Sequence, residues 1–210
     1  SLALVHMPEV EMWTFSPTAA SGKRVRRLGI NFGAPGDRKA ANGTLWLDYP
    51  SVGGKSPDVP MNVEGDEITF FREHSSGVEG AQPAWVFASG VRGVRAVRIR
   101  LMSEADSVDD RALYKVRLFF KLSRTQRPDT PEPVVLLQGE ALAGKNHRSG
   151  KPGTNSGDAH IVREFDSIEV GEALEITFES QPPDPPQPAQ QEIGVPILCG
   201  IEVILQSAGS

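Results

Sequence analysis

The sequence predicts an all-β protein, a β-sandwich of the jelly-roll type with about ten antiparallel strands. Short apolar runs alternate with polar residues at period two, which is typical of strands that bury one face. The 21 glycines and 17 prolines mostly fall between these runs, where turns are expected. No segment keeps a helical period over ten or more residues, and no fixed repeat is visible. These features favour a sandwich over a helical bundle, a propeller or a solenoid.

The clearest predicted strand is LYKVRLFFKL at 113–122. Its alternate apolar residues face one way, Lys115, Arg117 and Lys121 face the other, and Phe119 is the exception. Tyr114 is predicted to lie on the core-facing side. The other predicted strands are, in chain order, VRRLGIN, TLWLDY, DEITFF, AWVFAS, AVRIRL, PVVLLQ, HIVREF, ALEITFES and CGIEVILQ.

The composition predicts one domain at 23–210, preceded by a lead-in at 1–22 from another domain of a longer protein. Two tracts, the polar, glycine-rich 142–160 and the proline-rich 180–196, are predicted to be long excursions from the strands, and an external loop is favoured over a domain linker for 180–196. SEADSVDDRAL, at 103–113, is predicted to form either one helical turn or a polar connection between strands.

Charge and composition exclude several classes of protein. The net charge of -5 and the pI of about 5.4 argue against a nucleic-acid partner. No apolar run approaches the roughly 20 residues that a membrane span needs. The single cysteine, Cys199, excludes an internal disulfide and is expected to be a buried small hydrophobe. The four histidines lack ligand spacing, so neither a metal nor a cofactor is predicted.

No motif predicts an enzyme. GEALAGKN, at 139–146, approaches a phosphate-binding loop, but Asn146 replaces the serine or threonine, and no helix can follow. A hairpin turn with a basic tip is expected there instead. Glu104, Asp106 and Asp109 resemble paired catalytic carboxylates. They belong to a polar segment without an aromatic platform, so a solvated connection is expected.

The stretch LGINFGAPGDRKAANGTLWLDYPSVGG, at 28–54, is the richest in candidate binding residues. Its glycines and Pro35 predict a stiff loop, and Asn-Gly predicts a tight turn before a strand. Asp37 and Arg38 can pair with each other, pair with another loop, or bind a polar ligand. Trp46 and Asp48 share a face of the strand, and an aromatic ring beside a carboxylate is suited to a sugar. Packing of Trp46 and Trp85 beneath a loop is the alternative.

The second half of the chain resembles the malectin-like domains. LYKVRLFFK, VVLLQGEAL, HIVREFDSIEVGEALEITFES and PILCGIEVI follow in that family's order, and GIEV at 200–203 is the most diagnostic piece. RRLGINFG matches the family's opening strand more loosely. The 28–54 stretch also looks like domains that follow a quinoprotein-like β-propeller in large bacterial extracytoplasmic proteins.

This resemblance implies a non-catalytic jelly-roll module of a multidomain extracytoplasmic protein, which binds carbohydrate through loops at one end. The family uses several loop aromatics and an aspartate, whereas this chain has only Tyr49 as a loop tyrosine. The expected ligand-binding residues are Trp46, Asp48, Tyr49, Trp85 and His74, with Asp37 and Arg38 on the rim. The alternative is a structural or protein-interaction domain that docks on a neighbouring propeller, with an exposed apolar patch.

Overall fold

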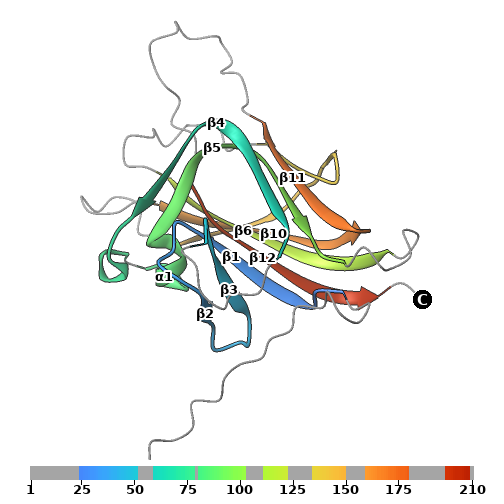
Figure 1. Ribbon diagram of the computed structural model, residues 1–210, viewed down its shortest axis with the longest axis horizontal. Helices are drawn as coiled ribbons and strands as arrows, with labels where there is room; N and C mark the ends of the chain where they lie inside the picture. Colours follow the sequence, from blue (N-terminus) through green and yellow to red (C-terminus); the bar gives the residue numbers. More distant parts are fainter. Residues whose placement is uncertain are drawn as a thin grey trace, which may run out of the picture.

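A computed structural model of the chain describes residues 24–51, 59–78, 80–102, 111–122, 134–149, 159–179 and 197–208. Almost all of the regular structure in these ranges is β-strand, so the all-β prediction is confirmed (Figure 1). The elements are β1 (Arg27–Phe32), β2 (Arg38–Lys39), β3 (Leu45–Tyr49), β4 (Met61–Arg72), the 3-10 turn η1 (Ser75–Gly77), α1 (Ala84–Phe87), β5 (Ser89–Arg100), β6 (Ala112–Leu122), β7 (Val134–Leu137), β8 (Glu140–Ala141), β9 (Lys145–Ser149), β10 (Ala159–Val170), β11 (Ala173–Glu179) and β12 (Ile197–Ala208).

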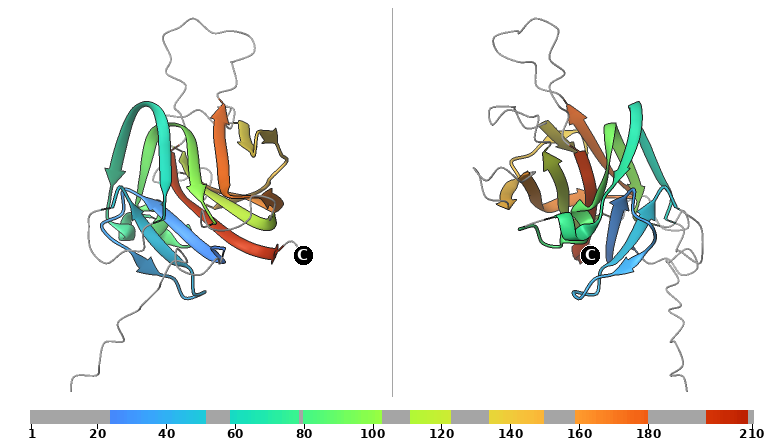
Figure 2. Two further views of the ribbon diagram at one scale, coloured as in Figure 1. Left: turned by 45° about the vertical axis from the view of Figure 1, so that its right-hand side comes forward. Right: turned by 90° about the vertical axis from the view of Figure 1, so that its left-hand side faces the viewer.

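The strands form two layers that pack face to face as a sandwich (Figures 1 and 2). One layer has the order β2-β3-β1-β12-β6-β10-β9, and the other has the order β4-β5-β11-β7-β8. The layers meet where β12 begins, because Leu198 pairs there with Val91 of β5.

One strand pair departs from the antiparallel prediction. β1 and β3 are parallel, whereas the other pairs among the described strands are antiparallel. The reason is the edge strand β2, which forms a hairpin with β3 and places β3 between β2 and β1. The chain therefore crosses from β1 to the sheet edge before it returns, as a parallel pair requires.

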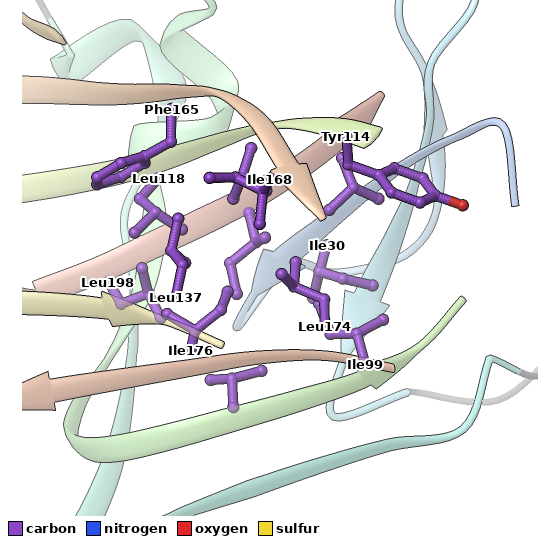
Figure 3. Packing of buried hydrophobic residues seen from close by; sticks show 14 of the residues in the cluster. Ile30, Ile99, Tyr114, Leu118, Leu137, Phe165, Ile168, Leu174, Ile176 and Leu198 are labelled. Atoms are coloured by element: carbon purple, nitrogen blue, oxygen red, sulfur yellow. The ribbon is translucent and has the colours of Figure 1, made fainter. Parts of the chain in front are cut away.

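The main core fills the space between the layers (Figure 3). It takes alternate residues from each strand, as period-two patterning requires. On β6, Tyr114, Val116, Leu118 and Phe120 all lie in this core, as predicted. The Tyr114 hydroxyl, at the edge of the core, donates a hydrogen bond to the backbone oxygen of Val25 at 2.9 Å.

A second, smaller cluster lies on the outer face of the β3-β1-β12-β6 layer. Phe119, the exception to the β6 pattern, packs there rather than in the main core. Cys199 is fully buried in the same cluster, which confirms the expectation for this residue. The cluster is formed by Trp46, Val78, Ala81, Val86, Phe87, Ala88, Phe119, Ile197 and Cys199.

The prediction of a strand at AWVFAS is wrong, because its first four residues form the helical turn α1. Val86 and Phe87 are adjacent in sequence, yet both are fully buried. A strand with one buried face would send them to opposite sides. The helical turn instead packs against β6 and β12, and both side chains belong to the outer cluster.

The prediction of a long excursion at 142–160 is also partly wrong, because Lys145–Ser149 forms the edge strand β9 against β10. Gly139 lies in the tight turn between β7 and β8, with a φ of 82°. Several other predictions fall outside the described residues: the lead-in at 1–22, the tract at 180–196, and the acids Glu104, Asp106 and Asp109. Among the described helices, none has the length and apolar character needed to cross a membrane.

Candidate functional site

Trp46 lines two pockets. The first, which we call the end pocket, has a volume of about 550 Å³. The second, the face pocket, has a volume of about 450 Å³ and lies on the outer face of the β12-β6-β10 strands. The described residues that line the end pocket are Asn31, Ala34, Pro35, Gly36, Asp37, Arg38, Trp46, Arg72, Glu73, His74, Ser75, Trp85, Ala88 and Ser89.

The predicted stiff loop after β1 forms one wall of the end pocket. Gly33 begins this loop with a φ of 71°, and a Cβ there would lie 2.9 Å from the backbone oxygen of Phe71. Only glycine accommodates both the angle and the contact without strain. Downstream, the Asp37 carboxylate accepts a hydrogen bond from the backbone N–H of Asp48 at 3.0 Å. This bond anchors the loop to β3, just before Arg38 begins β2.

The two candidate tryptophans meet at the base of the end pocket. Trp46 is only 3% exposed, and its ring contacts the half-buried Trp85 edge to face at 5.3 Å between centroids. The Arg38 guanidinium lies over the Trp85 ring, 5.0 Å from its centroid. Trp46 is therefore mainly a packing residue, whereas Trp85 is the aromatic ring that a ligand in this pocket can reach.

The opposite wall comes from the end of β4 and the segment after it. The Arg72 Nε donates to the backbone oxygen of Gly33 at 2.9 Å, which joins this wall to the glycine-rich loop. Glu73 forms an ion pair with the buried Lys121 of β6. His74 is exposed, and its Nδ1 accepts a hydrogen bond from the backbone N–H of Ser76 at 3.3 Å.

The structure thus brings five of the predicted candidates to the end pocket: Asp37, Arg38, Trp46, His74 and Trp85. Two others do not line it. Asp48 is 5% exposed on the Trp46 side of β3, and Tyr49 points to the other side. There the Tyr49 ring packs edge to face on Phe32 at 5.8 Å, because period two sends neighbours on β3 to opposite faces.

Sequence reasoning missed Arg72 and Glu73. Arg72 ends β4, Glu73 follows it, and no motif marked either residue. The available signal was their position directly before His74, which was already a candidate, but the sequence does not place the end of β4 opposite the glycine-rich loop.

The face pocket contains a network of charges across neighbouring strands. Arg117 on β6 donates to Glu164 on β10 at 2.7 Å and contacts Glu202 on β12 at 3.3 Å. Glu202 is 2% exposed and also accepts a hydrogen bond from the Thr44 hydroxyl at 2.6 Å. Lys115 donates to the second Glu164 oxygen at 3.0 Å. Antiparallel pairing sets these neighbours side by side, since Arg117 stands opposite both glutamates.

This network keeps Glu164 ionised. Burial alone would raise the pKa of the Glu164 carboxyl, but hydrogen bonds from Lys115 and Arg117 outweigh burial and hold the pKa below its ordinary value. A general acid needs a raised pKa at neutral pH, so Glu164 is unsuited to donate a proton there. The arrangement is suited to holding three strands in register.

The described residues contain no group of three or more histidine, cysteine, aspartate or glutamate side chains arranged to hold a metal ion. Comparison of the chain with models of protein families, with curated proteins and with solved structures finds no match. The malectin-like resemblance therefore stays a prediction.

Proposed function

We propose that this chain is a non-catalytic carbohydrate-binding module and that the end pocket is its binding site. One observation carries the proposal. Trp85, Asp37, Arg38 and His74, which come from three separate segments of the chain, line a single pocket of about 550 Å³. That volume lies within the range typical of small-molecule sites.

The chemistry of the pocket suits a polyhydroxylated ligand. Trp85 offers an accessible part of an aromatic ring for contact with C–H groups. Around it, the Asp37 carboxylate accepts hydrogen bonds, and the Arg38 and Arg72 guanidinium groups donate them. The lining also includes Asn31 and Ser89, which already hydrogen-bond to each other at 3.1 Å. A shallow site of this kind binds weakly, with the ring supplying contact and the polar groups supplying orientation.

The finer features of the proposal rest on the resemblance. We place the module in the jelly-roll, malectin-like class and in an extracytoplasmic, multidomain parent protein. The end pocket supports only the carbohydrate-binding part of this assignment, because loop residues 34–37 and residues 72–75 at and after the end of β4 line a single pocket.

The docking alternative has less support. Among the described residues, the exposed large hydrophobic side chains are Phe70 on β4 and Leu113 on β6. These strands belong to different layers, so the two side chains do not form one apolar patch. A docking surface for a propeller would need a contiguous one.

A glycan-array screen of the purified chain tests the proposal. We expect a defined set of glycans to bind, and we expect Trp85→Ala to abolish this binding while the circular-dichroism spectrum is retained. The matched control is Phe70→Ala, which removes an exposed aromatic ring outside the pocket and should leave binding unchanged. Absence of binding to any glycan, or equal losses in both variants, would overturn the proposal.

A further inference from the structure

We propose that the saccharide bound in the end pocket is acidic, with a carboxylate or sulfate group received by Arg72 and Arg38. This inference rests on the proposed function and narrows it to a ligand class. It follows from the charges that line the pocket and from how each charged group is already engaged.

Positive charge is in excess in the end pocket. Its charged lining residues are Asp37, Arg38, Arg72 and Glu73, together with the titratable His74. Glu73 is neutralised by its ion pair with Lys121. Within the described part of the chain, neither Arg38 nor Arg72 forms an ion pair, which leaves two guanidinium groups facing the single carboxylate of Asp37. This local excess contrasts with the net charge of -5 on the whole chain.

The guanidinium groups are also held in place. Arg72 uses only its Nε to bond the Gly33 oxygen, at 2.9 Å, so its two terminal nitrogens remain available as donors. The Arg38 guanidinium lies over the Trp85 ring, 5.0 Å from its centroid, and this cation–π contact holds it beside the aromatic surface. Planar arginine forks match carboxylate and sulfate oxygens in pairs, and an ordered fork loses less entropy on binding.

His74 adds a further polar group on the same wall. Its Nδ1 lies 2.7 Å from the Ser76 hydroxyl oxygen and 3.3 Å from the Ser76 backbone nitrogen, so Ser76 holds the exposed ring beside Arg72 in the pocket lining.

The face pocket provides an internal contrast. Its arginine, Arg117, already contacts two carboxylates of the same chain, Glu164 and Glu202. Positive charge in the face pocket is thus used to stabilise the sheet, whereas positive charge in the end pocket remains available for a ligand.

The test is titration calorimetry with a panel of acidic oligosaccharides, each matched to a neutral counterpart. For uronate oligosaccharides, the counterpart is the same oligosaccharide with its carboxylates reduced to alcohols. For sulfated oligosaccharides, the counterpart is the desulfated chain. We expect at least one acidic member to bind about tenfold or more tightly than its neutral partner, a difference of about 1.4 kcal/mol. The two arms show whether the recognised group is a carboxylate or a sulfate.

Variants assign the effect to the pocket. Arg72→Gln and Arg38→Gln should each weaken binding of the acidic member about tenfold more than they weaken binding of its neutral partner. The control is Arg95→Gln on β5, an exposed arginine outside the pocket that pairs with Asp66. Arg72→Lys keeps the charge without the fork and should restore binding only in part.

The outcomes separate the two proposals. Equal affinity for acidic and neutral partners, or preference for the neutral one, overturns the acidic ligand and leaves the saccharide site in place. If Arg72→Gln and Arg95→Gln lose the same affinity for the acidic oligosaccharide, the attraction is non-specific, and the acidic-ligand proposal is overturned as well. No binding by any member of either arm overturns the saccharide site itself, and the acidic ligand with it.

Discussion

The Trp46 ring lies directly on the backbone of Gly29. A Cβ at position 29 would be 2.2 Å from the Trp46 Cδ2 atom, far inside van der Waals contact. The parallel pairing of β1 with β3 sets the two residues side by side. The ring continues toward β12, where a Cβ at Gly200 would be 2.9 Å from Trp46 Cζ3. Glycines on two neighbouring strands therefore make the space that the indole fills.

This relationship predicts that Gly29→Ala destabilises the fold. The added methyl group must displace the Trp46 ring, and overpacking of a filled core costs about 1–3 kcal/mol. Urea denaturation measures the change in the free energy of unfolding. The control is Gly77→Ala in η1, because a Cβ there meets no atom within 4 Å. A similar, small change in both variants would contradict the packing described for Trp46.

The two tryptophans should differ in how they affect stability. Trp46 is 3% exposed and contacts Trp85 and Phe119, so Trp46→Ala leaves a large cavity. We expect a loss of about 3–5 kcal/mol in the free energy of unfolding. Trp85→Ala should cost clearly less, because the Trp85 ring is only half buried. Equal losses, measured by denaturation at one temperature, would contradict the division between a packing and a ligand-accessible tryptophan.

Period-two alternation predicted the strands well where one face enters the core. On β6 it separated Tyr114, Val116, Leu118 and Phe120 from the outward residues, and only Phe119 broke the pattern. The exception has a physical cause, since α1 covers that part of the outer face and makes it apolar as well. The strand prediction failed at α1 for a related reason. A run of four apolar residues has the same pattern in a buried strand and in a helical turn that lies on a sheet.

The end pocket was predictable only in part. Residue type alone marked Asp37, Arg38 and Trp85 as candidates, because charged loop residues and tryptophans suggest ligand binding even before the fold is known. The sequence could not show that Arg72, 34 residues after Arg38, lies on the opposite wall. Strand order determines that neighbourhood, and strand order depends on contacts between residues far apart in the chain. Tyr49 shows the opposite case, in which neighbours in sequence are separated in the fold. It directly follows Asp48, but its ring packs against the main core.

Thr44 should contribute to stability through a buried carboxylate. Its hydroxyl is fully buried and donates to Glu202 at 2.6 Å. Thr44→Val keeps the shape of the side chain but removes this donor, so one oxygen of a buried carboxylate loses a partner. We expect a loss of about 1–3 kcal/mol in the free energy of unfolding. Thr69→Val on β4 is the control, because Thr69 is exposed, and it should change stability little. Equal effects in the two variants would show that the Thr44–Glu202 bond contributes nothing.

The charge network on β6 and β10 should make stability depend on pH. Hydrogen bonds from Lys115 and Arg117 outweigh burial and lower the pKa of Glu164 in the folded chain. A carboxyl whose pKa is lower folded than unfolded binds protons more weakly in the folded state. Its contribution is therefore complete above the unfolded value, near pH 4.3, and is lost as the pH falls through the folded value. Asp166 adds in the same direction, because hydrogen bonds from Lys115 and Lys145 lower its pKa.

Glu164→Gln should remove most of this dependence. At pH 7 we expect the variant to be less stable than the original chain by about 1 kcal/mol, since the network is only partly buried. The difference should shrink as the pH falls below about 4, because the original carboxyl is then being protonated as well. Denaturation with urea at a series of pH values measures both curves. The control is Glu179→Gln on the exposed end of β11, which should follow the original chain at every pH. A difference for Glu164→Gln that stays constant from pH 7 to pH 3 would mean that the charge of Glu164 does not stabilise the sheet.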